Sequence, residues 1–380
     1  MMSVKKKLHL DADSIMLLLI IALIAIFVVN MFVIFGISSN LQERKQGAEE
    51  ASRPAKIELT TLSLACEGCF DASAFVGDIK KQAVNVTSEK IVDADSPEGQ
   101  ALIAQYDIQK LPTVIAGGEI NKSNAASFFS KWQASGNSIV YSAQPPPYYD
   151  VNRSRVVGRV SLTTLTARSC TECQNIAQVI SIFRQAGVKF IDEKAVEYDS
   201  AEGSTLIRKY SIQQIPAAII SDEIDVYPGM TQIFVQLNAT KRENSYAIHV
   251  ARPPYIDAKT GNITGLVDMI YLVDNSCATC YNVSQHRVIV TQAFGIVLDN
   301  EEYVDVSSAK GKDLINKYKI EKVPTMLLSA DAGAYAALKQ AWTDPRQGVG
   351  TIESDSWYVF RATEFMGTWK NLTSGQVVTR

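Results

Sequence analysis

Six cysteines, arranged as three Cys-x-x-Cys pairs, are the residues of this chain best suited to chemistry. The pairs read CEGC, CTEC and CATC, and they comprise Cys66 with Cys69, Cys170 with Cys173, and Cys277 with Cys280. In such a pair one thiolate can attack a disulfide, and the second cysteine can then resolve the mixed disulfide. The same spacing also suits an inert disulfide, or half of a four-sulfur zinc site built from different domains. We expect redox exchange with no metal and no cofactor, and the other two uses stay open as alternatives.

A repeated segment follows each cysteine pair at a nearly constant distance. SPEGQALIAQYDIQKLPT, SAEGSTLIRKYSIQQIPA and SAKGKDLINKYKIEKVPT each keep a Ser, a Gly three residues later, a Leu-Ile pair, a Tyr and a Pro. The prolines are Pro112, Pro216 and Pro324, and each lies 43 or 44 residues after the second cysteine of its pair. Matched units of about 105 residues have the size of a domain, so the sequence indicates three tandem copies.

The order of elements within a unit follows from its hydrophobic patterns. A strand pattern precedes each cysteine pair, as in KIELTTLSL, GRVSLTTLT and VDMIYLV. A helix pattern follows, in which Ile176, Val179, Ile180 and Phe183 recur at helical spacing. A second strand, a helix holding the Leu-Ile and Tyr residues, and a third strand that begins at the Pro complete the unit. This order predicts an α/β fold with a parallel strand pair and a late hairpin.

Each unit resembles a thioredoxin fold, through the Cys-x-x-Cys after the first strand and the Tyr-x-Ile-x-x-apolar-Pro before the third. We therefore expect three tandem thioredoxin-like domains preceded by one transmembrane helix. The resemblance implies that Pro112, Pro216 and Pro324 are cis and pack against the cysteines; a trans proline ending a helix is the alternative. It also implies that the preceding residues offer their backbone to an extended substrate; these are Leu111, Ile215 and Val323. The first cysteine of each pair would be the nucleophile, at a helix N-terminus that favours a thiolate, and the second would resolve.

Three departures from the family pattern argue against an efficient reductase. The usual Trp before the motif is replaced by Ala65, Ser169 and Ser276, and the usual buried acid six residues upstream by Thr60, Thr164 and Tyr271. The usual Gly-Pro inside the motif is also replaced, which puts Glu67 and Glu172 beside sulfurs and opposes thiolate formation there. We hypothesise that Cys277, in the neutral CATC, is the most acidic thiol.

The segment Ile15–Ile37 lies outside the repeats and predicts a transmembrane helix. Its 23 residues contain one clearly polar side chain, Asn30, and a helix of this length crosses the apolar core of a bilayer. A cleaved signal peptide and a buried helix are the alternatives. Lys5, Lys6 and Lys7 on a short N-terminal tail favour a cytoplasmic N-terminus, so we expect a single-pass cell-membrane protein whose domains lie outside the cytoplasm.

Asparagine sequons support the same exterior placement. Seven of the sixteen asparagines begin Asn-x-Ser/Thr, all beyond the apolar segment, and we predict glycosylation at Asn85, Asn121, Asn152, Asn238, Asn262, Asn282 and Asn371. The net charge of −3, with both signs well mixed, implies no nucleic-acid partner. The expected partners are membrane lipid around Ile15–Ile37, cysteine-containing envelope or secreted proteins, and a membrane redox partner.

The joints between the units also repeat. PPYYDVNRSRVVGRV and PPYIDAKTGNITGLV align without a gap, and each is predicted to be a hairpin that runs into the next first strand. TEFMGTWKNLTSGQVV looks like a degenerate third copy.

The predicted parts are a cytoplasmic tail (1–13), a transmembrane helix (14–37), a stalk (38–54) and thioredoxin-like domains at 55–147, 148–254 and 255–380. The predicted function is membrane-anchored thiol–disulfide exchange, and the alternative is a glycosylated scaffold or binding protein whose disulfides are inert staples.

Overall fold

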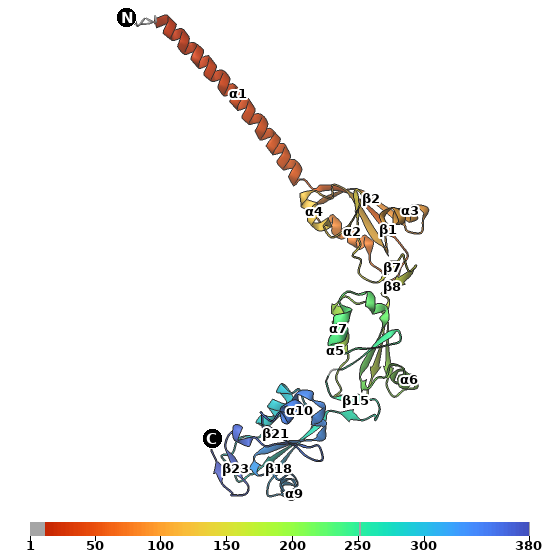
Figure 1. The fold of residues 1–380 in the computed structure, drawn as a ribbon, viewed down its shortest axis with the longest axis vertical. Coiled ribbons are helices and arrows are strands. Elements are labelled where there is room, and N and C mark those ends of the chain that lie inside the picture. Colours follow the sequence, from red (N-terminus) through yellow and green to blue (C-terminus); the bar gives the residue numbers. More distant parts are fainter. Residues whose placement is uncertain (1–11, 251, 380) are drawn as a thin grey trace, which may run out of the picture. The chain divides into compact units, whose positions relative to one another are not determined.

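The fold is described from a computed structural model that covers residues 12–250 and 252–379 (Figure 1). The chain divides into two compact units. One holds the residues up to Gln144 together with Tyr148–Arg155, and the other holds Pro145–Pro147 and the residues from Val156 onward. The first unit contains an N-terminal helix and one α/β domain, and the second contains two further α/β domains.

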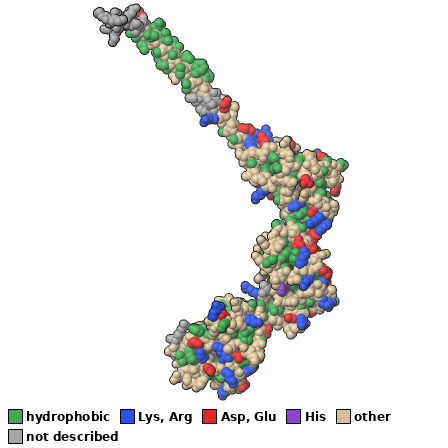
Figure 2. Space-filling view, in the orientation of Figure 1, with side chains coloured by type: hydrophobic (Ala, Val, Ile, Leu, Met, Phe, Trp, Pro, Cys, Tyr) green, Lys and Arg blue, Asp and Glu red, His purple; other side chains and the backbone are tan. Residues whose placement is uncertain are grey.

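The N-terminal helix α1 (Ala12–Ser52) runs through both the predicted membrane segment and the predicted stalk. Its stretch Ile15–Gly36 has a mean hydropathy of 3.2 and is not buried by protein, and apolar side chains cover it on the visible face (Figure 2). This is one helix long and apolar enough to cross a membrane. The predicted stalk is helical as far as Ser52, which extends α1 by about 24 Å beyond Gly36.

Arg53 ties the end of α1 to the first domain. Its guanidinium forms ion pairs with Glu50 on the helix and Glu119 in the domain. Its backbone carbonyl accepts a hydrogen bond from Asn124 Nδ2 at 2.8 Å. Arg53 and the backbone N–H of Lys56, which donates to Glu119 at 2.8 Å, lower the pKa of the Glu119 carboxyl to about 2. The helix therefore ends in polar contacts with the domain surface.

The first domain is a mixed sheet with helices on both faces. Its strands lie in the order β2-β1-β4-β6-β5, parallel between β1 and β2 and antiparallel elsewhere. Helices α2 and α4 pack on one face and α3 on the other. The elements are β1 (Ala55–Ser63), α2 (Ala72–Lys80), β2 (Val84–Asp93), α3 (Pro97–Tyr106), β3 (Lys110–Leu111), β4 (Thr113–Gly118), α4 (Ser123–Phe129), β5 (Gln133–Ser135) and β6 (Ser138–Val140).

The second domain repeats this architecture, with the strand order β10-β9-β12-β14-β13. Strands β9 and β10 are parallel, and the remaining pairs are antiparallel. Its elements are β9 (Val160–Thr166), α5 (Ala177–Gln185), β10 (Phe190–Glu197), α6 (Ala201–Tyr210), β11 (Gln214–Ile215), β12 (Ala217–Ser221), η1 (Asp222–Val226), α7 (Met230–Gln236), β13 (Thr240–Arg242) and β14 (Ser245–His249).

The third domain has the order β18-β17-β20-β22-β21. Helix α10 corresponds to α4 and α7, and Leu338 and Trp342 of α10 join the core. Compared with the second domain, the third has longer loops before β21 and between β21 and β22. A βαβ unit followed by antiparallel strands, with helices on both faces, is the thioredoxin-like arrangement, so the predicted fold class is confirmed. The elements are β17 (Leu266–Val273), α8 (Gln285–Val288), η2 (Ile289–Ala293), β18 (Val297–Asp305), α9 (Ala309–Tyr318), β19 (Lys322–Val323), β20 (Thr325–Leu328), η3 (Ala330–Ala334), α10 (Ala336–Thr343), β21 (Gly350–Ile352), β22 (Tyr358–Phe360) and η4 (Thr363–Phe365).

The repeated Ser-x-x-Gly segment has a structural cause. The serine hydroxyl caps the helix before the proline loop, because it accepts a hydrogen bond from the glycine N–H at 3.0, 2.9 and 3.0 Å in the three domains. A Cβ on any of these glycines would lie 2.1–2.2 Å from a backbone oxygen of the preceding strand. The three copies therefore preserve one tight strand-to-helix turn, formed by Ser96 and Gly99, Ser200 and Gly203, and Ser308 and Gly311.

Each domain carries a hairpin that pairs back onto the short strand before its proline. The hairpin strands are β7 (Tyr148–Asp150) and β8 (Arg155–Val157), β15 (Tyr255–Asp257) and β16 (Ile263–Thr264), and β23 (Trp369–Asn371) and β24 (Val377–Val378). They extend β3, β11 and β19 into three-stranded sheets. The segment that looked like a degenerate third copy is thus a hairpin. The predicted domain boundaries at 148 and 255 fall just before the hairpins, so they assign β7 and β15 to the next domain, although these strands pair with β3 and β11 of the preceding one.

Proline and glycine shape the first two hairpins. The Pro146–Pro147 and Pro253–Pro254 peptide bonds are also cis, although no pattern in the sequence indicated this. Gly158 and Gly265 connect these hairpins to the next first strand with φ of +83° and +91°. A Cβ on either glycine would lie 2.5 or 2.3 Å from the preceding proline ring, so both positions require glycine.

Candidate functional site

Each Cys-x-x-Cys pair forms a disulfide in the structure. The Cα–Cα distances are 5.5, 5.4 and 5.5 Å for Cys66–Cys69, Cys170–Cys173 and Cys277–Cys280. All six cysteines are thereby paired. Within residues 12–250 and 252–379, no group of three or more His, Cys, Asp and Glu side chains is placed to hold a metal ion.

The cysteines do not lie at helix N-termini, contrary to the expectation from the resemblance. Each pair lies in a turn, and helices α2, α5 and α8 begin three, four and five residues after the second cysteine. Polar side chains start two of these helices: Asp71 accepts the Ala74 N–H at 2.9 Å, and Asn175 accepts the Ala177 N–H at 2.8 Å. Because the helix dipole acts within the first turn, it favours negative charge at these caps and gives the sulfurs little help.

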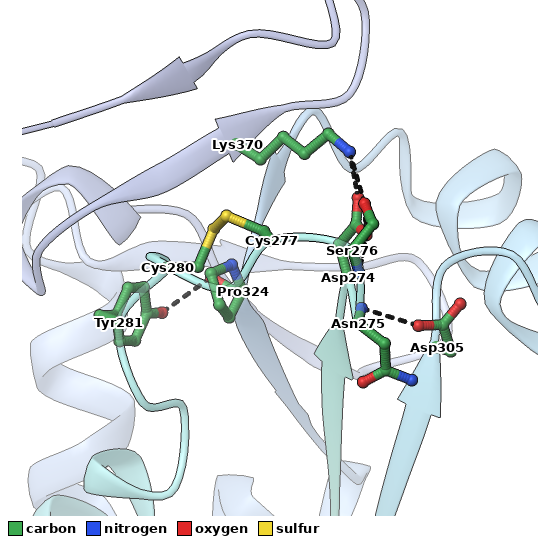
Figure 3. The surroundings of a disulfide bond; sticks show 9 residues. All are labelled: Asp274, Asn275, Ser276, Cys277, Cys280, Tyr281, Asp305, Pro324 and Lys370. Carbon is green, nitrogen blue, oxygen red and sulfur yellow. Dashed lines mark hydrogen bonds and ion pairs between the residues drawn. A yellow bond between two sulfur atoms is a disulfide. The ribbon is translucent and has the colours of Figure 1, made fainter.

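The three predicted prolines lie in cis loops, as the resemblance implies. The Leu111–Pro112, Ile215–Pro216 and Val323–Pro324 peptide bonds are all cis. In the third domain the Pro324 ring lies beside the Cys277–Cys280 disulfide (Figure 3). The structure therefore brings together, in this domain, the sulfur pair and the proline loop that are 44 residues apart in the sequence.

The residue before each proline is already paired with the hairpin of its own domain. Leu111 lies opposite Tyr149, Ile215 opposite Ile256, and Val323 opposite Lys370. Two residues earlier, the carbonyl of Gln109, Gln213 or Glu321 accepts a hairpin N–H at 2.9, 2.9 and 2.8 Å. Hydrogen-bonded and non-hydrogen-bonded pairs alternate in an antiparallel ladder, so the residue before each proline is itself hydrogen-bonded. A substrate strand can pair there only after the hairpin strand has left.

The three disulfides differ in accessibility. Cys170 is only 7% exposed and packs in a cluster with Leu165, Val196 and Tyr210. Cys66 and Cys277, the first cysteines of the other pairs, are half-buried. Since thiol–disulfide exchange needs access to the attacked sulfur, the first and third pairs are better placed to react than the second.

A half-buried tyrosine and a buried histidine support the proline loop of the third domain. Tyr281, which directly follows Cys280, donates its hydroxyl hydrogen to the Pro324 carbonyl at 2.7 Å (Figure 3). His286 Nε2 lies 3.0 Å from the same hydroxyl oxygen. The carbonyl can only accept, so the imidazole must donate its Nε2 hydrogen to the tyrosine oxygen. Burial lowers the pKa of His286 to about 4, which keeps the ring neutral near pH 7.

A lysine from the hairpin reaches the disulfide turn of the third domain. Lys370 Nζ lies 2.6 Å from a carboxylate oxygen of Asp274 and 3.0 Å from the Ser276 hydroxyl, next to Cys277 (Figure 3). The side chains of Lys370 and Asp274 are 21% and 9% exposed. The corresponding residues of the other hairpins, Tyr149 and Ile256, carry no charge. Neither Lys370 nor the Tyr281–His286 pair was predicted. The repeat TEFMGTWKNLTSGQVV was the only sequence signal for the segment that contains Lys370.

The position of the family's buried acid is held by uncharged side chains. The residue after each proline pairs with Leu62, Leu165 or Leu272. The residues before these leucines are therefore equivalent, namely Thr61, Thr164 and Tyr271. This corrects the predicted Thr60 by one position, because the first domain has one residue fewer between its strand and its cysteines. A thiol has no carboxylate proton acceptor at this position in any of the three domains.

The predicted glycosylation sites lie on the surface of the domains. Six of the seven asparagines are exposed, and Asn371 is half-buried. The Asn371 side chain accepts the backbone N–H groups of Thr373 and Ser374 at 2.9 Å, which fixes the turn of the third hairpin. Asn282 lies two residues after Cys280 and is exposed, so a glycan there would be close to the third disulfide.

Comparisons with known proteins place no further constraint on function. Neither a family model nor a curated protein sequence matches the chain. The chain is similar to a crystal structure of ERdj5 in form II, at 10% identity and a TM-score of 0.16; the match covers 75% of this chain and 39% of that one. It is similar to human ERp44 in form II, at 10% identity and a TM-score of 0.14, over 74% and 77% of the two chains. It is also similar to the NTD_N/C domain of alkylhydroperoxide reductase AhpF from Enterococcus faecalis, at 16% identity and a TM-score of 0.14, over 45% and 81%. At such scores the fold assignment rests on the strand order alone.

Proposed function

We propose that this chain is a membrane-anchored thiol–disulfide oxidoreductase that acts outside the cytoplasm. The observation that carries the proposal is the Cys277–Cys280 disulfide, which lies beside Pro324 in a thioredoxin-like domain with Cys277 half-buried (Figure 3). The Cys66–Cys69 pair has a similar exposure, and the buried Cys170 makes the second pair the least reactive.

The exchange reaction balances within the pair and its substrate. A substrate thiolate attacks Cys277 Sγ, the Cys277–Cys280 bond breaks, and Cys280 leaves as a thiolate that takes a proton from water. A second substrate thiolate then attacks the substrate sulfur of the mixed disulfide and releases Cys277. The substrate gains a disulfide, and the cysteine pair gains two electrons and two protons. The reverse sequence reduces a substrate disulfide.

Helix α1 and the exposed sequons support the proposed location of this activity. We propose that Ile15–Gly36 is an uncleaved anchor with the N-terminus in the cytoplasm, so that the three domains meet cysteine-containing envelope or secreted proteins. The apolar character of this helix and the surface position of the sequon asparagines support the proposal. A membrane redox partner would reset the cysteine pairs after each reaction.

A redox titration tests the proposed activity. The full-length protein in detergent is equilibrated with glutathione buffers of defined potential, and new thiols are alkylated and assigned to each pair by mass spectrometry. We expect Cys277–Cys280 to be reduced at a potential above about −300 mV, where labile rather than structural bridges react. If no pair is reduced at physiological glutathione potentials, the chain is not an oxidoreductase.

Two observations favour a second candidate, a glycosylated scaffold with inert staples. In all three domains the edge beside the proline is occupied by the hairpin strand, and no helix N-terminus stabilises a thiolate. A scaffold needs neither a free edge beside the proline nor a stabilised thiolate. The same titration separates the two candidates, because structural bridges stay oxidised throughout.

A further inference from the structure

We infer that strand β23 is a replaceable occupant of a peptide-binding edge, and that Asp274 selects a basic residue on the polypeptide that replaces it. The expected ligand is an extended, cysteine-containing segment with a Lys or Arg at the position now held by Lys370. The inference rests on the proposed function, since it names the class of substrate for the third domain.

The third hairpin is the least anchored of the three. In the first, Pro146, Pro147 and Tyr148 are buried, and in the second, Pro253, Pro254 and Ile256 are buried. In the third, no residue between 367 and 378 is buried. Removing β23 from β19 therefore exposes less apolar surface than removing β7 or β15 from its partner, and it costs less hydrophobic free energy.

Besides backbone pairing and the half-buried Leu372, the third hairpin has an ionic contact with the disulfide turn. Lys370 reaches Asp274 and Ser276, and both of these residues belong to the turn that carries Cys277. The Ser276 N–H and hydroxyl also bond to Asp274, and Asp305 adds a second carboxylate near the turn by accepting the Asn275 N–H at 2.9 Å (Figure 3). Lys370 is thus the cation that balances a locally acidic turn.

This arrangement makes the edge selective for charge. If β23 leaves, the Asp274 carboxylate, whose side chain is 9% exposed with Lys370 in place, loses its cation. An incoming strand is therefore favoured when it restores a positive charge beside this carboxylate. The backbone groups of Val323 then pair with that strand in the same antiparallel register that Lys370 now uses. This is β-strand addition with a charge requirement beside the disulfide.

Peptide binding to full-length variants tests the inference. The probes are two fluorescein-labelled hexapeptides: one has the chain's own 367–372 sequence, Gly-Thr-Trp-Lys-Asn-Leu, and the other has Glu in place of the Lys. In the K370E variant Asp274 repels the chain's own strand and the edge is free. We expect the Lys peptide to bind K370E at least about tenfold more tightly than the unmodified protein, and the Glu peptide to bind neither.

Rescue and controls separate this effect from misfolding. The double variant D274K/K370E restores the ion pair with reversed charges, so weak binding of the Lys peptide should return. The variant K370M, which keeps the aliphatic stem, should lie between K370E and the unmodified protein. K241E alters an exposed pair with Asp225 in the second domain and should change nothing. Tryptophan fluorescence verifies that the third domain stays folded in each variant.

Several results would overturn the inference. They are equal binding of the Lys peptide to K370E and the unmodified protein, equal binding of both peptides to folded K370E, and absence of binding to folded K370E. Dimerisation of K370E with β23 exchanged between copies would make a second copy the occupant and would also refute the assignment. The glutathione titration is independent of these readouts, so a failed inference and a failed proposed function are distinguishable.

Discussion

Acidification should destabilise the third domain through His286. This side chain is 2% exposed, contacts the Tyr281 hydroxyl and packs against the Phe360 ring at a centroid distance of 4.6 Å. Burial lowers its pKa from the ordinary 6.5 to about 4 in the folded domain. Between these values the unfolded chain binds a proton that the folded domain does not bind, so falling pH favours unfolding.

The size of the effect follows from the two pKa values. A pKa of about 4 against 6.5 corresponds to about 3 kcal/mol, since each unit is worth 1.36 kcal/mol. About 2 kcal/mol of this stability is lost between pH 7.5 and pH 5, and the loss levels off below pH 4. Carboxylates with lowered pKa values, such as Asp274, lose their contribution mainly below pH 4, so they interfere little above pH 5.

Urea unfolding followed by tryptophan fluorescence measures the third domain selectively. Three of the four tryptophans lie in it, and the variant W132F removes the fourth. We expect the urea midpoint to fall by about 1 M between pH 7.5 and pH 5. The matched control adds H286Q, which offers an N–H donor and does not titrate, and it should lose much less. An equal shift in both proteins would refute the assignment of the pH dependence to His286.

Three further outcomes are expected. With dithiothreitol, the pair containing Cys170 should be reduced about tenfold more slowly than the other two, as site-resolved alkylation will report, because Cys170 is 7% exposed; equal rates would contradict this. In single-pair variants, alkylation rates against pH should identify Cys277 as the most acidic of the three first thiols, and a more acidic thiol in either of the other domains would refute the hypothesis. The variant G203A should lower the unfolding temperature of the second domain by several degrees, because its Cβ would lie 2.2 Å from the Glu197 backbone oxygen. The control G77A, whose Cβ would have no atom within 4 Å, should leave the stability of the first domain unchanged or raise it.

The sequence predicted the fold because its strongest signals are local and occur three times. The Ser-x-x-Gly segment encodes a helix cap and a close strand contact within four residues, so its pattern survives in all three copies. Charge pairs between the second strand and the following helix follow the same positions. In the first two domains the strand carries the lysine and the helix the glutamate, as Lys90–Glu98 and Lys194–Glu202. In the third domain the charges are exchanged, as Glu302–Lys310. The repeated Ser-x-x-Gly pattern therefore aligns this part of the three units from the sequence alone, and the structure adds charge pairs at matching positions.

The environment of the sulfurs was less predictable because it depends on register between distant, short segments. The strands that meet beside the prolines are only two or three residues long, and no hydrophobic alternation sets their pairing. The helix after the first cysteine pair begins at a polar N-cap, Asp71, and not at the cysteines. The positive end of the helix dipole therefore lies away from the sulfurs. The deletion of one residue between strand and motif likewise shifted the buried position from Thr60 to Thr61.

The loop that each disulfide closes bears on the choice between enzyme and scaffold. The paired cysteines are three residues apart in all three domains. In the chain-entropy description, closing a four-residue loop stabilises a fold by about 2 kcal/mol, against about 4.7 kcal/mol for a loop of 100 residues. Each bridge also lies in a domain that has its own apolar core, such as the one formed by Phe183, Ile220 and Ile224 in the second. A staple in this position therefore adds little that the core does not already provide. Its short span beside a proline loop suits a bond that forms and breaks while the domain stays folded, and this favours exchange over permanent cross-linking.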